Sequence, residues 1–395
     1  MKKISIISIV LISLMLAGAS MQAAEPPASA GPKTEWQNMT AGICKSAGVL
    51  SGQPWDVNVT GMLILPNGAV AISVAQQKGF YRSDDQGATW TKWGEKWMRG
   101  DAQCGWAYTI HYPNRLSFFL GYGWGVVVSS DGGETLVRFP AVIKIIDPKG
   151  KERGVPVDFG DMDLLANMPP KTVLGGVHHG DIAGGEWVMT SDSGKTWDWP
   201  PAPLKERLFH RVGVVDASTL LRGTQTQDKF HLPAPGIWLS PDLGKNWTKV
   251  SDYTLQGRVP VHYNSNIYWA AREGVVVSRD GGKTWSVCGS AVQGIVFGPY
   301  FGKSEQEMMV VSAKGFHITK DGGRSWTLAA PFFVPPAIPG AWGPNTSILA
   351  PETKSEHWTG AMWCFGWDAG KDLLYAQTFA GHVWKLQLGS SPAVQ

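Results

Sequence analysis

The sequence has little charge and few cysteines. Asp, Glu, Lys and Arg make up 17% of its 395 residues, and the formal net charge is +3. A balance so close to neutral does not favour a nucleic acid or an acidic membrane surface as partner. The four cysteines, Cys44, Cys104, Cys288 and Cys364, form no CxxC pair, so we expect no zinc, no other metal and no cofactor. In an oxidising compartment one or two disulfides are open to them, and the spacing leaves the pairing undecided.

Long apolar runs are also missing after the first residues, so no later stretch is expected to span a membrane. The run Ile4–Leu16 follows two lysines and precedes a series of small residues that ends at Ala24. This is the layout of a secretory signal peptide over 1–24, with cleavage expected between Ala19 and Glu25. No cysteine lies there for a lipid anchor. We expect a secreted or periplasmic protein, with a retained membrane anchor as the alternative.

Glycine and tryptophan are abundant instead. The 48 glycines and 20 tryptophans indicate many short strands and tight turns, hence an all-β fold. One octet, Ser/Thr-x-Asp-x-Gly-x-Thr-Trp, recurs with small variations, and its aspartates are 38 to 61 residues apart. Most intervals match the period of roughly 40–50 residues of a propeller blade. The six aspartates are Asp85, Asp131, Asp192, Asp242, Asp280 and Asp321.

The octet has the chemistry of a turn between two strands. A short carboxylate can accept hydrogen bonds from the backbone N–H groups that follow it, and the glycine supplies a positive φ. The threonine begins the outgoing strand, and the tryptophan packs on a neighbouring element. We therefore interpret the six aspartates as structural and not catalytic.

Glycine-led strands precede the octets and extend the repeat to the end of the chain. Six precede an octet, and a seventh, Gly381–Lys385, has none after it. The N-terminal segment near 34–40 resembles the missing outer strand. The sequence thus predicts a seven-bladed β-propeller of four-stranded blades in one domain, 25–395, its ring closed by pairing of the N-terminal strand with the last blade. Residues 143–170 and 330–358 are predicted to be long loops.

The octet resembles the Asp-box (BNR) repeat of the sialidase-like superfamily, and the resemblance covers nearly the whole mature chain. It implies that the boxes lie between the third and fourth strands of each blade, on the face opposite the ligand site. Members include sialidases, xyloglucanases, photosystem II assembly factors and sortilin-type receptors. The first blade, at Trp55–Val59, lacks the Arg-Ile-Pro motif of true sialidases. The resemblance therefore predicts the fold better than the chemistry.

If that layout holds, loops of blades three to five bring polar side chains to the ligand face. Five of the nine histidines fall between 178 and 262. Arginine could pair with a sugar carboxylate, and His or Tyr could act as general base or acid. The candidate catalytic residues are His178, His210, Arg211, His262 and Tyr263. The candidate binding residues are Arg99, Asp101, Asp181, His231, Arg258, Arg272 and Trp358.

Two functions remain open from the sequence. The first is a monomeric propeller that recognises carbohydrate and either only binds it or also cleaves it, as a glycosidase or a polysaccharide lyase. The second is a non-catalytic scaffold or assembly factor that binds a protein partner. Convergence of the candidate histidines and arginines in one pocket would favour the first function.

Overall fold

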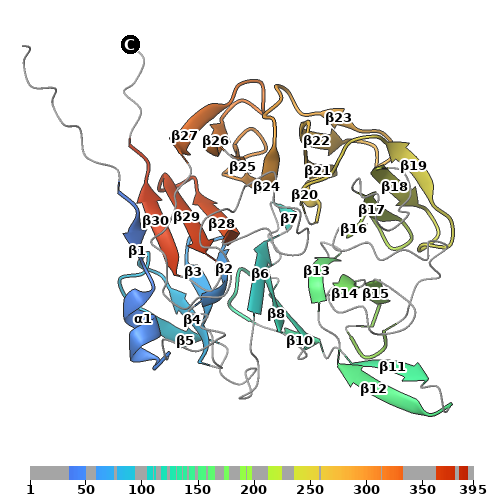
Figure 1. Ribbon diagram of the computed structural model, residues 1–395, viewed down its shortest axis with the longest axis horizontal. Helices are drawn as coiled ribbons and strands as arrows, with labels where there is room; N and C mark the ends of the chain where they lie inside the picture. The colour runs from blue at the N-terminus through green and yellow to red at the C-terminus, as the bar shows by residue number, and fades with distance from the viewer. Residues whose placement is uncertain are drawn as a thin grey trace, which may run out of the picture. The chain divides into compact units, whose positions relative to one another are not determined.

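The computed structural model is all-β, as predicted, with one short helix (Figure 1). It describes residues 35–49, 59–74, 78–93, 105–109, 111–112, 117–121, 125–129, 131–135, 137–139, 142–146, 150–156, 159–164, 173–177, 187–192, 194–197, 212–224, 235–257, 259–312, 314–331, 362–378 and 382–389. Within these residues the strands form eight sheets, five of which have four antiparallel strands each. The remaining predictions for the fold, a blade count of seven and a closed ring, stay predictions.

The sheets follow one another along the chain, and we number the larger ones in that order. Sheet 1 contains β2 (Val59–Ile64), β3 (Val70–Val74), β4 (Gly79–Ser83) and β5 (Thr91–Trp93). Sheet 2 contains β6 (Gly105–Thr109), β8 (Ser117–Gly121), β9 (Gly125–Ser129) and β10 (Val137–Phe139). Sheet 3 contains β13 (Phe159–Leu164), β14 (Val173–Val177) and β15 (Trp187–Thr190). Sheet 4 contains β16 (Val212–Val214), β17 (Leu220–Thr224), β18 (Gly236–Ser240) and β19 (Thr248–Ser251).

The later sheets include two strands from distant parts of the chain. Sheet 5 contains β20 (Val261–Tyr263), β21 (Asn266–Ala271), β22 (Gly274–Ser278), β23 (Ser286–Val287) and the two-residue β7 (His111–Tyr112). Sheet 6 contains β24 (Ile295–Phe301), β25 (Met308–Ser312), β26 (Gly315–Thr319) and β27 (Thr327–Pro331). Sheet 7 contains β28 (Met362–Asp368), β29 (Leu373–Thr378), β30 (Val383–Gln387) and β1 (Gln37–Asn38).

One predicted loop is partly wrong. The segment 143–170 carries a two-stranded hairpin, β11 (Val142–Ile146) and β12 (Glu152–Pro156), followed by β13. The signal Asp147–Gly150 predicts a turn, and the segments on either side of it, Val142–Ile146 and Glu152–Pro156, pair as strands. The first of them is rich in branched residues, Val142, Ile143 and Ile145 among them. The second predicted loop, 330–358, lies almost wholly outside the described residues.

The central strands are buried on both faces where neighbouring sheets pack on them. All five residues of β3, β22 and β25 are buried. Apolar clusters join sheet 3 to sheet 4, sheet 4 to sheet 5, sheet 5 to sheet 6, and sheet 6 to sheet 7. Strands buried on both sides are typically continuous apolar runs, as in Gly274–Val277.

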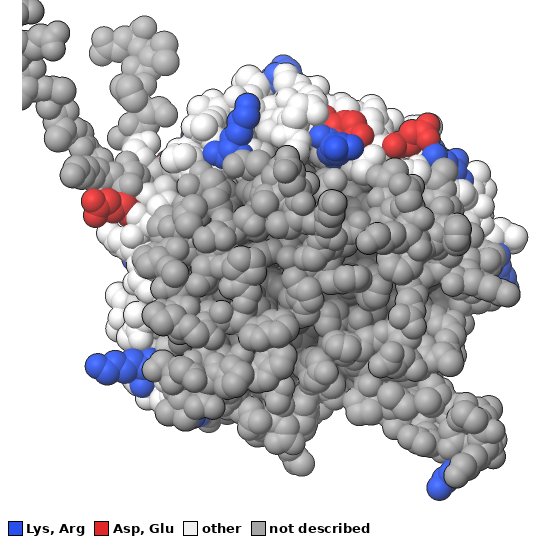
Figure 2. Space-filling model, in the orientation of Figure 1, with Lys and Arg blue, Asp and Glu red and all other residues white. Residues whose placement is uncertain are grey.

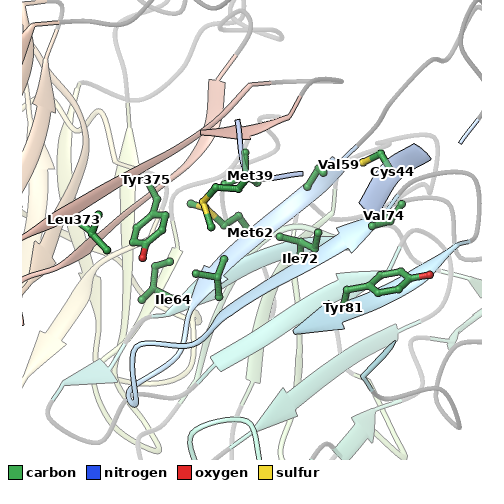
Figure 3. Packing of buried hydrophobic residues seen from close by; sticks show 12 residues of the cluster. Met39, Cys44, Val59, Met62, Ile64, Ile72, Val74, Tyr81, Leu373 and Tyr375 are labelled. Carbon is green, nitrogen blue, oxygen red and sulfur yellow. The ribbon is translucent and has the colours of Figure 1, made fainter. Parts of the chain in front are cut away.

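The N-terminal segment joins the last sheet to the first. β1 pairs antiparallel with β30, with Gln37 opposite Lys385 and Asn38 opposite Trp384. After β1, the helix α1 (Ala41–Ser46) buries Cys44. Figure 3 shows Met39 near Tyr375 of sheet 7 and Met62 of sheet 1, all in one buried cluster. The sequence predicted the pairing of the chain ends but not the helix.

Candidate functional site

Each Asp box ends the third strand of its sheet. In sheet 5, Ser278 is the last residue of β22 and Asp280 follows in the turn to β23. At the other end of β22, Arg272 and Glu273 form the turn from β21. Five residues at about 3.3 Å each separate the two ends by roughly 17 Å. The box end and the opposite end are therefore distinct regions of the sheet.

All six boxes share one hydrogen-bond pattern. The box Ser or Thr hydroxyl donates to the aspartate Oδ1 at 2.7–2.9 Å and accepts from the box glycine N–H at 2.7–3.0 Å. The residue four positions after the aspartate donates its N–H to Oδ1 at 2.8–2.9 Å. Its side chain donates to Oδ2 at 2.5–2.7 Å. Both carboxylate oxygens are thus occupied within the turn.

These bonds explain the acidity of the box aspartates. The Thr89 hydroxyl and then its N–H lower the pKa of Asp85 to about 2. The Thr196 N–H and hydroxyl lower the pKa of Asp192 to about 2, and the Ser325 hydroxyl and N–H do the same for Asp321. A carboxylate with so low a pKa is ionised at neutral pH and is no proton donor. The structural interpretation of the boxes therefore agrees with their geometry.

The boxes also pack on the preceding sheet, which sequence reasoning missed. The six box glycines have φ between 79° and 93°. A Cβ on Gly87 would lie 2.8 Å from Met39, which follows β1 of sheet 7, and one on Gly282 would lie 2.9 Å from Leu221 of sheet 4. A Cβ on Gly323 would lie 2.6 Å from the carbonyl oxygen of Cys288. The glycine is therefore needed for close approach as well as for the turn.

Three candidate residues lie among the described ones, and the structure does not bring them together. His262 lies opposite Ile267 in the register of sheet 5, and Ile267 lies opposite Ser278 of the box. His262 and Tyr263 are therefore at the box end, whereas Arg272 is exposed at the opposite end. Tyr263 is only 9% exposed, and its ring lies 4.8 Å from that of Phe301 in the core between sheets 5 and 6.

β7 crosses from sheet 2 to the inner edge of sheet 5. It pairs with β20 in parallel, with His111 opposite His262 and Tyr112 opposite Tyr263. No local pattern in the sequence indicated this pairing, because a two-residue strand has no periodicity of its own. The other candidates lie outside the described residues: His178, His210, Arg211, Arg99, Asp101, Asp181, His231, Arg258 and Trp358.

The end opposite the boxes offers polar groups that the sequence did not single out. Next to Arg272, Glu273 accepts the N–H of Thr254 at 3.2 Å, and the Arg272 N–H donates to the Thr254 carbonyl at 2.8 Å. The turn is therefore held in place while it presents a guanidinium and a carboxylate. Such a pair can bind sugar hydroxyls, and the guanidinium can bind an acidic group.

His382, just before β30, lies at the corresponding end of sheet 7. Its Nδ1 is 3.1 Å from the hydroxyl of Thr40, which also accepts the N–H of Val383 at 3.0 Å. Burial lowers the pKa of His382, so the imidazole is neutral near pH 7. Thr40 is fully buried, and we interpret this contact as an anchor for the N-terminal segment.

Neither described thiol is poised for reaction. Cys44 and Cys288 are both buried. Burial raises the pKa of Cys44 to about 12, and burial also raises that of Cys288. Over the described ranges, no group of three or more His, Cys, Asp or Glu side chains could hold a metal ion. The same ranges contain no helix long and apolar enough to cross a membrane.

Among the residues coloured in Figure 2, Lys and Arg lie singly or beside Asp and Glu.

Comparison with known proteins supports the Asp boxes. The family described as "BNR/Asp-box repeat" matches residues 276–287, around Asp280. A xyloglucanase from Hypocrea jecorina (strain QM6a) is 24% identical over 218 residues, which are 52% of this chain and 23% of that protein. The chain thus spans about a quarter of the length of this relative.

Solved structures with similar architecture share little sequence. "YCF48 bound to D1 peptide" matches 90% of this chain and 97% of its own, with 13% identity and a TM-score of 0.45. A GH74 enzyme from Niastella koreensis matches 83% of this chain and 53% of its own, with 16% identity and a TM-score of 0.36. The chain carries BNR/Asp-box repeats and is not a recognisable true sialidase.

Proposed function

We propose that this protein is a secreted or periplasmic β-propeller that recognises carbohydrate at the sheet ends opposite the Asp boxes. The observation that carries the proposal is the relation to a xyloglucanase over about half of the chain. The box carboxylates are saturated by their own turns, so we look for the ligand at the other ends of the sheets.

The proposed architecture is a closed ring of seven blades. It is supported by the pairing of β1 with β30 and by the cluster that joins sheet 7 to sheet 1. The box of sheet 1 contacts Met39 in the way that later boxes contact their preceding sheets. A ring needs the same kind of contact between its last and first blades.

The proposed ligand site uses the candidate residues of the sequence with one change. Arg272 and the newly found Glu273 lie at the end of sheet 5 opposite its Asp box, whereas His262 and Tyr263 lie at the box end. We therefore expect Arg272 and the candidates outside the described residues to contribute to binding: His178, His210, Arg211, Arg99, Asp101, Asp181, His231, Arg258 and Trp358. A turnover assay, and not a binding assay, tests whether the protein also cleaves the glycan.

Calorimetric titration of the purified mature protein tests the proposal. The probes are neutral xyloglucan oligosaccharides and acidic oligogalacturonates. We expect Arg272→Ala and Arg211→Ala to weaken binding at least tenfold, and Lys371→Ala, in the β28–β29 turn outside the Asp boxes, to leave it unchanged. Absence of binding to every glycan would overturn the proposal.

The same protein can be assayed for the two remaining alternatives. New reducing ends after incubation with glycan would show hydrolysis, and unsaturated uronate absorbing in the ultraviolet would show a lyase. A stable protein partner recovered in place of any glycan would establish the scaffold function.

N-terminal sequencing of the exported protein tests the leader, and we expect the mature chain to begin between residues 20 and 25.

A further inference from the structure

The Asp boxes carry charges of opposite sign in two sectors of the molecule. Two positions of each octet are variable and face solvent, the one before the aspartate and the one before the threonine. In sheets 1 and 2 their charged residues are acidic, Asp84 and Glu134. In sheets 3 to 6 they are only basic: Lys195, Lys245, Arg279, Lys283, Lys320 and Arg324.

The basic residues lie on sheets that pack on one another in sequence. Apolar clusters join sheet 3 to sheet 4, sheet 4 to sheet 5 and sheet 5 to sheet 6. Packed sheets are about 10 Å apart, so neighbouring boxes present their cations at comparable intervals. This distance is close to the Debye length of about 8–10 Å at physiological salt, so the cations act together on one long anion.

The turns hold these cations at fixed places. The residues that follow Lys195, Lys245, Lys283 and Arg324 donate their N–H to the box aspartate, as Thr284 does to Asp280 at 2.9 Å. The Arg324 guanidinium is itself oriented by a hydrogen bond from Nε to the Asp321 carbonyl at 3.0 Å. Arg279 hydrogen-bonds the thiol of Cys288. All six side chains are exposed.

Nearby carboxylates are occupied by their own turns. The four box aspartates of this sector accept hydrogen bonds from the turn at both oxygens. Glu305 accepts from Asn266 at 2.6 Å and from the Tyr268 hydroxyl. Glu307 accepts the N–H of Lys303 at 2.8 Å. These acids lower the net charge at the box ends of sheets 3 to 6. The hydrogen-bond donors that these ends offer to an anionic ligand are the side chains of the six cations.

We infer that the box ends of sheets 3 to 6 form a second binding surface, for an anionic polysaccharide. The surface is separate from the proposed site, because the two lie at opposite ends of the sheets. A polymer that carries one carboxylate or sulfate on each sugar unit can pair with cations that recur from one sheet to the next. The choice of polysaccharide over an acidic protein rests on the proposed function. A membrane is not favoured, because the large exposed apolar residues found, Val137 and Leu328, lie outside the boxes.

A charge-reversal variant tests the inference. Lys195, Lys245, Lys283 and Arg324 are changed together to Glu, and binding to polygalacturonate is measured by fluorescence titration at low and high salt. The matched control reverses four exposed lysines outside the boxes: Lys45, Lys151, Lys314 and Lys371. We expect the box variant to bind at least tenfold more weakly and to lose most of the salt dependence, while the control keeps both.

Three further readouts make the result decisive. Thermal unfolding checks that both variants fold, and a quadruple change to Gln replaces the Glu variant if that one does not. Binding of neutral xyloglucan oligosaccharides reports the proposed site, and we expect the box variant to retain it. Equal loss in the box and control variants would overturn the inference, as would binding of anionic lipid vesicles or of an acidic protein but not of polygalacturonate.

Discussion

Lys385 in sheet 7 donates a hydrogen bond from its Nζ to the carbonyl oxygen of Gln86 in the first Asp box, at 2.9 Å. The two residues are 299 positions apart in the sequence. With Met39 packed against Gly87, this bond ties the end of the chain to its first sheet. The chain ends therefore contribute to the stability of the first sheet.

Replacement of Lys385 by Met should weaken this junction. The variant keeps the apolar stem but leaves the Gln86 carbonyl without its partner, so we expect a loss of about 1 kcal/mol in the free energy of unfolding. Urea denaturation measures it. Lys45→Met, on the exposed side of α1, is the control and should cost clearly less. Equal costs for the two would show that the Lys385 bond does not stabilise the junction.

Removal of a box carboxylate should destabilise the protein without weakening the binding of neutral xyloglucan oligosaccharides at the proposed site. In Asp280→Ala, the Ser278 hydroxyl and the N–H and hydroxyl of Thr284 lose their acceptor, which should cost about 1–3 kcal/mol. Denaturant unfolding gives the cost, and calorimetry gives the affinity for glycan. Asp252→Ala, which removes an exposed carboxylate that is paired only with Lys249, should change stability little. Lost glycan affinity in a folded Asp280 variant would contradict the structural role.

The box aspartates should make stability depend on pH in acid. Folding lowers the pKa of Asp85, Asp192 and Asp321 from 3.8 to about 2. Below pH 4 the unfolded chain therefore binds protons that the folded chain does not, so stability falls as the pH drops from about 4 toward 2. Urea midpoints measured between pH 7 and pH 2.5 check this. The triple Asn variant should show a smaller fall, and an equal fall would assign the acid sensitivity to other carboxylates.

The sequence predicted the repeated parts of this fold and missed the parts that do not repeat. The octet and the glycine-led strand before it depend on local turn bonds, so such strands can be located to within about two residues. The predicted strand Gly381–Lys385, for example, is observed as β30, Val383–Gln387. The hairpin β11–β12 and the parallel pair β7–β20 were missed, because each occurs once and the second joins residues 151 positions apart. His262 and Arg272 were grouped by sequence proximity, although a strand runs between the two ends at which they lie.

The box glycines should be sensitive to alanine according to what their Cβ would meet. Gly323 has a φ of +88°, and its Cβ would lie 2.6 Å from the backbone oxygen of Cys288. Gly294 has a φ of +68° with nothing within 4 Å, so it is a control for the dihedral cost alone. We expect Gly294→Ala to cost about 1 kcal/mol, from a left-handed backbone with a side chain. Gly323→Ala should cost at least about 2 kcal/mol more, because sheet 6 must also move away from Cys288. Urea denaturation of both variants gives the difference, and similar costs would mean that the boxes do not need their close approach to the preceding sheet.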